Sequence, residues 1–458
     1  MFYNRVKELQ LLETLWSAKK PVLAVVYGRR RIGKTELLRE FTKNHPAVYL
    51  LGRQESEHKQ LEHISRACAE FFNDEQLNSR PFGNFDSVFS YFAEKLKQKP
   101  FAVFLDEFPY FVQANPSLPS ILQDHWDKAL QHMPCLFVLC GSSVSMMEKL
   151  LGYKSPLYGR RTHQMKLDPL DFSEARHFFP KTMDIKKQIS YYAVLGGTPA
   201  YLLEFDYTKT LVSNIGEKIL EKQSFLFRDP MFVLREELDE PRNYFSIVAA
   251  IAKGNTGIGR IVNDTGLEKG TVNKYLGVLI DLDLVERAVP ITERKEKSRK
   301  GIYKLKDPFF RFWFRFVFEN MDYVEQRKQK NLLNEKIEPE LNAFIGKGFE
   351  EVCRDRLSKN AAFKDYLIGS WWDKGEEIDI VGLSKAKKSA LFCECKWKEK
   401  VDAESLLRKL KQKAEKVSWF KEHRTERYCL FAKSFKEKKI DEKNADLYDL
   451  KDLEETFG

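Results

Sequence analysis

The segment PVLAVVYGRRRIGKT, residues 21–35, decides the fold of the N-terminal part of the chain. Its first half, Pro21–Tyr27, is a continuous apolar run of strand length, as expected for a strand that is buried on both faces. Its second half, Gly28–Thr35, follows the pattern GxxxxGK[ST], and Glu36–Thr42 after it favours a helix. The order of strand, glycine-rich loop and helix predicts a phosphate-binding loop.

The residue types in this loop suit the binding of ATP. Gly28 and Gly33 let backbone N–H groups approach phosphates without a Cβ in the way, and the helix N-terminus adds a dipole that favours anions. Lys34 is expected to reach the β- and γ-phosphates, and the Thr35 hydroxyl to bind Mg²⁺. The predicted nucleotide-binding residues of the loop are Gly28, Arg29, Arg30, Arg31, Ile32, Gly33, Lys34, Thr35 and Glu36.

Three more strand-like segments follow, Ala47–Leu51, Phe101–Leu105 and Leu136–Cys140, and the last two end in polar residues. Phe101–Leu105 runs into Asp106, which we expect to hold Mg²⁺ through water, and Glu107, which we expect to orient and deprotonate the attacking water. A solvated strand end is the alternative, and the phosphate-binding loop makes it the weaker one. Leu136–Cys140 is followed by Ser142, which can sense the γ-phosphate or cap the next helix.

The basic segment Tyr158–Arg161 follows that strand. Arginines at this place often approach the γ-phosphate, either within one chain or from a neighbouring subunit, so Arg160 is a candidate catalytic residue. The alternative is a surface pair of basic residues, and the sequence does not decide between the two. A contribution from a neighbouring subunit would make the protein a homo-oligomer.

The middle of the chain has the pattern of a winged helix. Residues 241–253, 258–264 and 268–280 have helical patterns, and a short turn at Gly266 separates the second from the third. The loop between two strand-like segments that follow contains the basic residues Arg294, Lys295, Lys297, Arg299 and Lys300. Together with a net charge of +10, this predicts DNA as a partner, with one helix in the major groove and the wing on phosphates. The alternative is a lid or protein-docking module with a solvated charged face.

An aromatic-rich segment, Tyr303–Val317, comes directly after the predicted wing. Aromatic side chains at close spacing can stack on bases. Such density is more often found in a core helix that packs between domains. We favour the core interpretation.

The C-terminal third contains a set of acidic residues typical of nucleases. A helix from Gly346 carries Glu350, and two strand-like segments carry Asp379 and then Glu394 and Lys396. A strand period of two puts Glu394 and Lys396 on one face, and a hairpin can bring Asp379 to them. The carboxylates can hold Mg²⁺ or Mn²⁺, with Glu350 as a further ligand, and Lys396 can stabilise the charge on the attacking water or the phosphate. The alternative is a fold that persists only as a binding module.

Composition indicates a globular protein without a membrane span. No run of about 18 apolar residues occurs, and the first residues lack the apolar core of a signal peptide. The seven cysteines are scattered, which favours reduced thiols and no disulfide framework. We expect a cytoplasmic location and no membrane partner.

Several segments resemble known ATPases of the AAA-like and STAND-like branch. Asn4 and Arg5 begin a segment similar to the Asn-Arg-x-x-Glu-Leu entry of that group, which lies near the adenine. Leu195–Leu202, with Pro199, looks like the Gly-x-Pro element of the helical lid, also near the base. The whole chain resembles archaeal-type ATPases with a winged helix and a C-terminal PD-(D/E)xK restriction-endonuclease-like domain, although Ile378 replaces the usual proline before Asp379.

The predicted fold class is α/β: a P-loop NTPase parallel sheet with a helical lid, a winged-helix domain and a C-terminal α/β restriction-endonuclease-like domain. The expected divisions are a P-loop ATPase core at residues 1–170, a lid at 171–238, a winged helix with an aromatic linker at 239–325 and a nuclease-like domain at 326–458. The first functional hypothesis is a DNA-associated ATPase whose nucleotide state regulates metal-dependent DNA cleavage. The alternatives are a STAND-type ATP-dependent switch or an ATP-gated DNA-binding regulator, each with an inactive nuclease-like domain.

Overall fold

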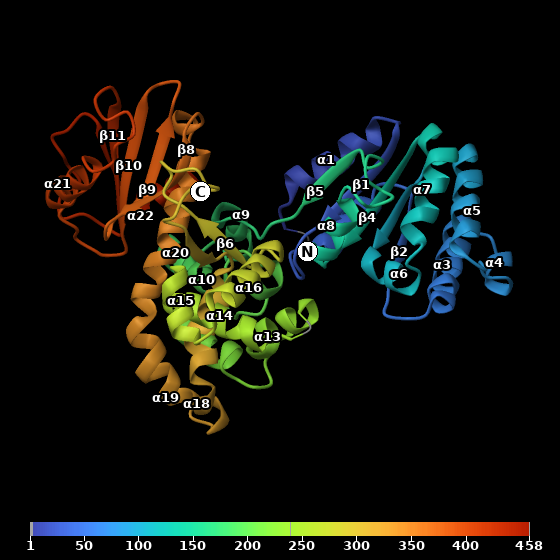
Figure 1. Ribbon diagram of the computed structural model, residues 1–458, viewed down its shortest axis with the longest axis horizontal. Coiled ribbons are helices and arrows are strands. Elements are labelled where there is room, and N and C mark those ends of the chain that lie inside the picture. The colour runs from blue at the N-terminus through green and yellow to red at the C-terminus, as the bar shows by residue number, and fades with distance from the viewer. Residues whose placement is uncertain (1–2, 239, 458) are drawn as a thin grey trace. The chain divides into compact units, whose positions relative to one another are not determined.

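A computed structural model describes residues 3–238 and 240–457 of the chain (Figure 1). The chain forms two compact units, Met1–Asp168 and Pro169–Gly458. The first unit contains the phosphate-loop pattern, and the second contains the predicted winged helix and the C-terminal carboxylates. None of the helices in the described ranges is long and apolar enough to cross a membrane.

The first unit contains a parallel sheet of five strands in the order β2-β3-β4-β1-β5. Its strands are β1 Pro21–Tyr27, β2 Ala47–Leu51, β3 Ala102–Asp106, β4 Cys135–Gly141 and β5 His163–Lys166. The predicted apolar runs form four of them, with bounds within one residue of those expected. The edge strand β5 was not predicted because its sequence, HQMK, has no apolar run, and only Met165 in it is buried.

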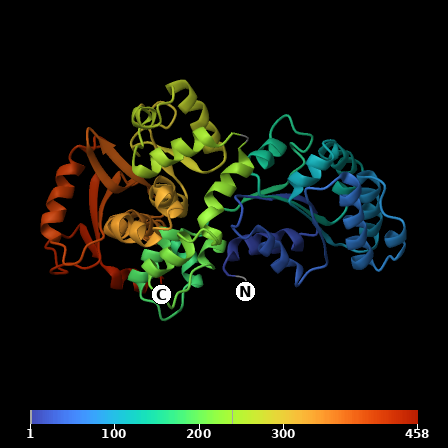
Figure 2. The same ribbon diagram turned by 90° about the horizontal axis from the view of Figure 1, so that it is seen from below.

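Helices cover both faces of this sheet, as the continuous apolar run of β1 requires (Figures 1 and 2). Val22 and Val26 pack with α1 and α2, whereas Leu23 and Val25 belong to the core formed with the other helices. The helices are α1 Val6–Ser17, α2 Lys34–Thr42, α3 Glu57–Phe72, α4 Gln76–Ser79, α5 Phe85–Gln98, α6 Phe108–Ala114, α7 Leu118–Lys128 and α8 Val144–Leu151.

The second unit begins with short helices. They are α9 Phe172–Ala175, α10 Ile185–Leu195, α11 Pro199–Leu202, α12 Leu211–Asn214 and α13 Phe225–Glu237. Gly196 ends α10 with a φ of 65°, and a Cβ there would lie 2.8 Å from the Pro308 ring, so a larger residue is disfavoured. This contact joins the short helices to the aromatic segment.

A helix–ribbon segment, residues 242–305, follows in the second unit. Its elements are α14 Arg242–Lys253, α15 Ile258–Thr265, α16 Lys269–Asp281, β6 Val285–Ala288 and β7 Ile302–Leu305. Gly266 ends α15 in the left-handed region at φ 67°, where glycine carries no steric cost. The two strands pair antiparallel, from Val285 opposite Leu305 to Ala288 opposite Ile302. The order of elements matches the expectation.

The aromatic segment forms part of the core. It folds into α17 Pro308–Phe312 and a π-helical turn, Trp313–Val317. The side chains of Phe309, Phe312 and Trp313 are fully buried, and the Trp313 indole N–H donates to the Phe227 carbonyl at 2.9 Å. The interpretation of this segment as a packed core helix is confirmed.

The C-terminal part of the second unit is a mixed sheet in the order β12-β11-β10-β9-β8. The strands are β8 Leu367–Asp373, β9 Glu376–Ser384, β10 Ser389–Lys396, β11 Thr425–Ala432 and β12 Ala445–Tyr448. β8, β9 and β10 pair antiparallel, and β10, β11 and β12 pair parallel. The accompanying helices are α18 Met321–Glu325, α19 Gln329–Leu332, α20 Glu338–Lys359, α21 Ala403–Ala414 and α22 Leu450–Phe457. Phe392 of β10 packs with α21, whereas Cys393 and Cys395 pack with α20.

The loop between β6 and β7 is attached to the edge strand β8. The Ile291 N–H donates to the Ser370 carbonyl at 2.9 Å, and the Trp372 indole donates to the Lys300 carbonyl at 3.0 Å. Lys300 also forms an ion pair with Asp373 at 2.9 Å. These contacts cover an edge that would otherwise present unpaired backbone groups, and they hold the helix–ribbon segment against the C-terminal sheet.

Candidate functional site

The phosphate-loop pattern adopts a conformation that needs its glycines. Gly33 has a φ of 91°, a region that L side chains rarely adopt. A Cβ on Gly28 would lie 2.3 Å from the carbonyl oxygen of Leu167 and 2.5 Å from the Ile32 side chain. The loop is therefore packed so closely that only glycine fits at position 28.

The Lys34 side chain closes over this loop. Its Nζ donates to the carbonyl oxygens of Gly28 at 2.9 Å and Arg29 at 2.8 Å. Burial lowers the pKa of Lys34, while the carboxylates of Asp106 and Glu107 act in the opposite direction. The ammonium thus lies in the loop, where the phosphates of a nucleotide are expected.

Asp106 is joined directly to the loop residue predicted to bind Mg²⁺. The Thr35 hydroxyl donates to Asp106 Oδ2 at 2.8 Å, and the Glu107 backbone N–H donates to Oδ1 at 2.9 Å. Tyr49 of β2 also donates to Oδ2, and burial followed by the Asp106 charge raises the pKa of its hydroxyl. The contact of Tyr49 with Asp106 was not predicted from the sequence. The place of Tyr49 in β2, the strand beside β3, was the available clue, since adjacent parallel strands end at the same edge.

The backbone and the side chain of Glu107 are both constrained. Its φ of 52° places a non-glycine residue in the left-handed region, at a cost of about 1–3 kcal/mol. The Ser142 hydroxyl donates to Oε1, and the Ser142 backbone N–H donates to Oε2 at 3.2 Å. The two predicted residues are thus in contact, and Ser142 orients the carboxylate proposed to act on water.

Arg5 and Arg30 support the loop from different sides. The Arg5 guanidinium donates to the Ile32 carbonyl at 2.9 Å and to the Asp168 carbonyl at 2.7 Å. Asn4 and Arg5 both have positive φ values, 57° and 61°. Arg30 donates to the Tyr110 hydroxyl at 3.0 Å. The described contacts of Arg5 are with protein backbone and Glu8, so contact with adenine by Asn4 and Arg5 stays a prediction.

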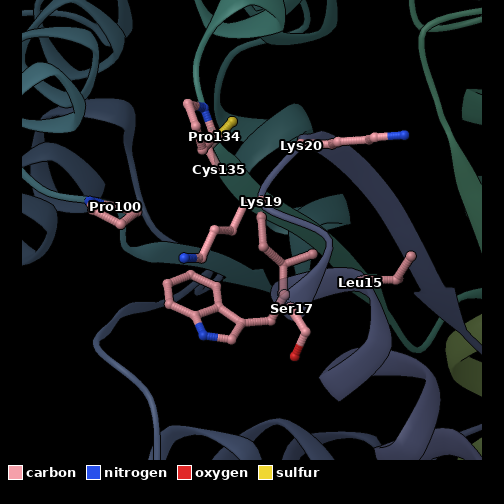
Figure 3. Close-up of a pocket in the computed structure, with 9 residues that line it drawn as sticks. Leu15, Ser17, Lys19, Lys20, Pro100, Pro134 and Cys135 are labelled. Atoms are coloured by element: carbon pink, nitrogen blue, oxygen red, sulfur yellow. The ribbon is translucent and has the colours of Figure 1, made fainter.

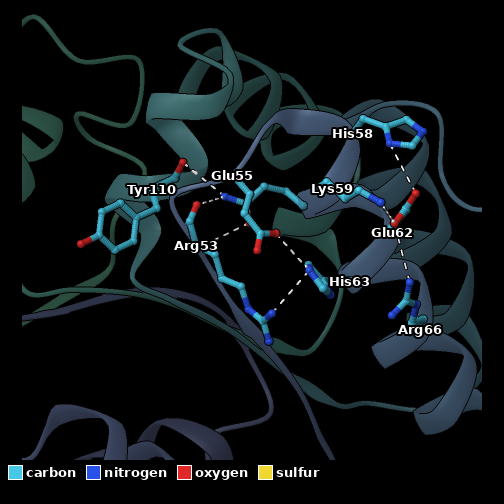
Figure 4. A network of polar contacts seen from close by, with 9 residues as sticks. Arg53, Glu55, His58, Lys59, Glu62, His63, Arg66 and Tyr110 are labelled. Carbon is cyan, nitrogen blue, oxygen red and sulfur yellow. Dashed lines mark hydrogen bonds and ion pairs between the residues drawn. The ribbon is translucent and has the colours of Figure 1, made fainter.

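A polar network fixes the segment that follows β2 (Figure 4). Buried Gln60 accepts from the Arg53 N–H at 3.3 Å and donates to the Arg53 carbonyl at 2.5 Å. Arg53 Nη1 lies 3.5 Å from His63 Nε2. The N–H of the preceding Gly52 donates to the Asp106 carbonyl at 2.8 Å. The network therefore stabilises backbone that is hydrogen-bonded to the end of β3.

An apolar pocket of about 250 Å³ lies at the opposite edge of the sheet (Figure 3). Pro100, Pro134 and Cys135, where β3 and β4 begin, line it together with Leu15 and Trp16. Nucleotides bind outside the carboxyl ends of parallel strands, so this pocket is on the wrong edge for ATP. None of the predicted site residues lines it.

Two other predicted nucleotide contacts lie elsewhere. Arg160 forms an ion pair with Asp127 of α7, at 2.9 Å, and also donates to nearby backbone carbonyls. Pro199 belongs to the second unit, at the first position of α11 beside Thr198. Arg160 is thus not placed with Glu107 and Ser142, and the roles of Arg160 and Pro199 stay predictions.

The C-terminal carboxylates meet at the ends of β9 and β10. Lys396 donates to Glu394 Oε1 at 2.7 Å, as the strand period predicted, and Lys413 of α21 contacts both Glu394 oxygens at 3.0 Å. The backbone N–H of Cys395 donates to Asp379 Oδ2 at 2.8 Å. Lys413 was missed because its lysine-rich helix offers several equivalent candidates in sequence.

The pKa values of two acids in this group are raised. Burial, and then the Glu394 charge, raises the pKa of Asp379 to about 6. Burial, and then the Asp379 charge, raises the pKa of Glu350 to about 7. Across the described residues, no three His, Cys, Asp or Glu side chains are arranged to hold one ion. An ion between Asp379 and Glu394 would therefore take its remaining ligands from water and substrate, and Glu350 as a ligand stays a prediction.

The cysteine side chains form no part of this site. All seven are free and buried, including Cys393 and Cys395 beside Glu394. Burial raises the pKa of both thiols well above the usual value, so both stay protonated. The interpretation of these residues as core thiols is confirmed.

Comparison with known proteins agrees with the nucleotide site. Residues 2–205 match a family described as an ATPase domain predominantly from Archaea, and residues 313–414 match archaeal and bacterial proteins of unknown function. An uncharacterized protein of Methanocaldococcus jannaschii is 33% identical over 414 residues, which are 88% of this chain and 89% of that protein. The chain belongs to the family of that protein: it is an archaeal-type P-loop ATPase with a C-terminal domain of unknown function.

Two further similarities are to an ATP-binding protein and to an ATPase. An uncharacterized ATP-binding protein of the same organism is 50% identical over 44 residues, which are 10% of this chain and 75% of that protein. The Walker-type ATPase of Pyrococcus abyssi covers 68% of this chain and 96% of its own length, with a TM-score of 0.54 and 19% identity. The latter similarity shows the fold alone.

Proposed function

We propose that this protein hydrolyses Mg²⁺-bound ATP and uses the nucleotide state to control its second unit. The supporting observation is a series of hydrogen bonds that links Thr35 to Asp106, Asp106 to the Glu107 backbone, and the Glu107 carboxylate to Ser142. Thr35 and Asp106 would hold Mg²⁺, directly and through water, and Lys34 would bind the β- and γ-phosphates. Glu107 would orient the water that attacks the γ-phosphate and accept its proton, and Mg²⁺ would supply neutralisation of the phosphate charge.

Each of the four predicted domains would have its own role. Residues 1–170 would form the P-loop ATPase core, 171–238 the helical lid, 239–325 the winged helix with its aromatic linker and 326–458 the nuclease-like domain. The lid would bring Pro199 to the adenine. Arg160 would act on the γ-phosphate, in its own chain or in a neighbouring subunit, once it is released from Asp127.

A second function, metal-dependent DNA cleavage, is supported by the group of Asp379, Glu394 and Lys396. Asp379 and Glu394 would hold Mg²⁺ or Mn²⁺, which activates water and stabilises charge on the phosphate. Lys396 would move from Glu394 to the attacked phosphate. The exposed residues Arg294, Lys297 and Arg299 of the ribbon loop would contact DNA phosphates.

ATP turnover tests the first proposal. Lys34→Ala is expected to reduce hydrolysis at least about 100-fold, since one electrostatic contact to the transition state contributes roughly 3 kcal/mol. Lys128→Ala, an exposed lysine paired with Asp124, is the control and should hydrolyse like the wild type. Unchanged turnover in Lys34→Ala would refute the assignment.

Plasmid DNA with Mg²⁺ or Mn²⁺ tests the second function. We expect nicking by the wild type and none by Asp379→Ala. Cutting that persists in Asp379→Ala would reveal a contaminating nuclease. If the wild type does not cut with or without ATP, the alternatives hold: an ATP-dependent switch or a DNA-binding regulator with an inactive domain.

A further inference from the structure

The second unit contains a cavity of about 350 Å³ between the ribbon, α17, α20 and β9. The ribbon contributes Lys304 from β7, α17 contributes Arg311, α20 contributes Lys347 and Glu350, and β9 contributes Glu377. The ribbon loop is bonded to β8, and β8 pairs with β9, so these bonds hold the ribbon against the sheet that supplies one wall. The cavity is therefore part of the fold of this unit.

The walls of the cavity contain both basic and acidic residues. Its basic residues are Lys304, Lys306, Arg311, Arg315, Lys347 and Arg354. Its acidic residues are Glu286, Glu350, Glu351 and Glu377. Arg315 pairs with Glu340 at 2.6 Å and Lys306 with Asp283 at 2.5 Å, and neither of these two acids lines the cavity. The lining therefore has six cations and four anions, and two of the six cations are paired with acids outside the lining.

Some donors in these walls lack an acceptor. Arg311 lies over the Phe344 ring, and its Nη1 donates to Glu351 at 2.7 Å. Its Nε and Nη2, and Nε of Arg354, are enclosed and have no acceptor among the described residues. Guanidinium groups pair best with anions that offer several acceptor oxygens, so the Arg311 and Arg354 side chains in these walls favour such a ligand.

The cavity adjoins the proposed metal site and a second hollow. Glu350 lines the cavity and is also close enough to Asp379 to interact with its charge. Glu286 and Lys306 are shared with a second, more open hollow of about 450 Å³ that extends to Lys295 of the ribbon loop. The cavity therefore has the hollow beside the basic loop on one side and Glu350, which neighbours Asp379, on the other.

The volume limits what can enter. It lies at the lower end of the range of small-molecule pockets, about 300–1,000 Å³. One nucleotide fits such a space, whereas a base-paired duplex does not. An enzyme that acts on an enclosed nucleotide must receive it from a single strand or extrude it from the duplex.

We propose that this cavity binds one phosphorylated nucleoside, either within or at the end of a nucleic-acid strand or as a free mononucleotide. Lys304, Lys347 and Arg354 contact its phosphate beside the Asp379 group. The inference rests on the proposed cleavage function and specifies its substrate as a single unpaired nucleotide. It also makes the ribbon part of the site, since Lys304 comes from β7.

Binding measured in EDTA tests this inference separately from cleavage. The full chain is titrated with dTMP by calorimetry, and with a fluorescein-labelled 12-nucleotide single strand or its blunt duplex by anisotropy. Lys304→Gln and Lys347→Gln are compared with Lys209→Gln, an exposed lysine paired with Glu217, after thermal unfolding has shown that each variant is folded. Each cavity variant should bind the single strand roughly 10-fold more weakly, the loss of one charge-assisted hydrogen bond, and the control should match the wild type.

The arms distinguish the two sources of the ligand. If dTMP binds and displaces the strand, the cavity accepts a free nucleotide as well as one in a strand. If dTMP does not compete at millimolar concentration but Lys304→Gln still loses the strand, the ligand is a nucleotide within a strand. Wild-type affinity for the strand in both cavity variants overturns the inference, and so does equally tight binding of the blunt duplex with the same loss.

The proposed function can fail independently. A protein that binds the strand through Lys304 and Lys347 but never cuts DNA keeps this inference and loses the nuclease. A protein that cuts DNA while Lys304→Gln and Lys347→Gln bind like the wild type loses only this inference.

Discussion

At the scale of single residues, the two carboxylate groups differ in the contacts of their aspartates. Asp106 is fully buried and accepts hydrogen bonds from Thr35, Tyr49 and the Glu107 backbone. Asp379 accepts from the Cys395 backbone and lies near the Glu394 charge, and its pKa is raised. Asp379 therefore gains its full charge most favourably when a cation or a lysine compensates it.

Ser142 should affect the rate of ATP hydrolysis more than ATP binding. Its hydroxyl donates a hydrogen bond to the Glu107 carboxylate and so orients it. We expect Ser142→Ala to lower kcat roughly 10-fold with a small change in KM, and Glu107→Gln to lower kcat by roughly 10²–10⁴, the range of general-base catalysis. Steady-state turnover separates the two parameters. A change confined to KM in Ser142→Ala would mean that Ser142 binds nucleotide instead of orienting Glu107.

The raised pKa of Asp379 predicts a stability effect that depends on pH. Since the folded-state pKa, about 6, exceeds the usual unfolded value near 3.8, burial of this acid is least unfavourable below pH 3.8 and costs most above pH 6. Asp379→Asn should therefore come close to the wild type near pH 4 and become more stable by about 3 kcal/mol at pH 7.5. Urea unfolding across this range measures the difference.

Glu376→Gln is the matched control for Asp379→Asn. Glu376 is on the same strand, exposed, and paired with Lys416, so its contribution to stability should be small at every pH. A constant difference between wild type and Asp379→Asn from pH 4 to 7.5 would contradict the predicted titration. Addition of Mn²⁺ should raise the melting temperature of the wild type and leave that of Asp379→Asn unchanged, because ligand binding stabilises only a competent site.

At the scale of elements, the phosphate loop depends on the chain that follows β5. Gly28→Ala would place a Cβ 2.3 Å from the Leu167 carbonyl, a backbone atom that has little freedom to move. We expect a loss of about 1–3 kcal/mol in stability and a large loss of ATP affinity. Gly83→Ala, where a Cβ has open space, is the control. Thermal unfolding with and without ATP would contradict the prediction if Gly28→Ala retained the wild-type melting temperature and ATP-induced shift.

The elements that could be predicted are those with strong apolar patterns. β1 and β2 have the expected bounds, and the pairing of Glu394 with Lys396 follows from a period of two. β5 could not be predicted because its stability comes from pairing with β1, not from its own side chains. The ribbon loop was expected to be free for DNA, yet Lys300 pairs with Glu293 and Asp373. Such contacts between distant segments leave no local pattern in the sequence.

For the whole molecule, Arg5 offers a route by which nucleotide state can reach the second unit. One guanidinium bonds to Ile32 in the phosphate loop and to Asp168, the last residue of the first unit. A shift of the loop on ATP binding would change the geometry at the point where the chain enters the second unit. Lysine cannot make both bonds from one planar group, so Arg5→Lys should weaken this route while retaining the charge.

Coupling between ATP and DNA must then be reciprocal. In Glu107→Gln, which should bind ATP without turning it over, we expect ATP to change DNA affinity 5-fold to 150-fold, the range of about 1–3 kcal/mol, and DNA to change ATP affinity by the same factor. Arg5→Lys in that background should bring both factors toward one, because each ligand then acts on its own unit alone. Anisotropy with labelled DNA and calorimetry with ATP measure the two factors. Factors of one in Glu107→Gln itself would refute control of the second unit by ATP, and unchanged factors in Arg5→Lys would show that the coupling does not pass through Arg5.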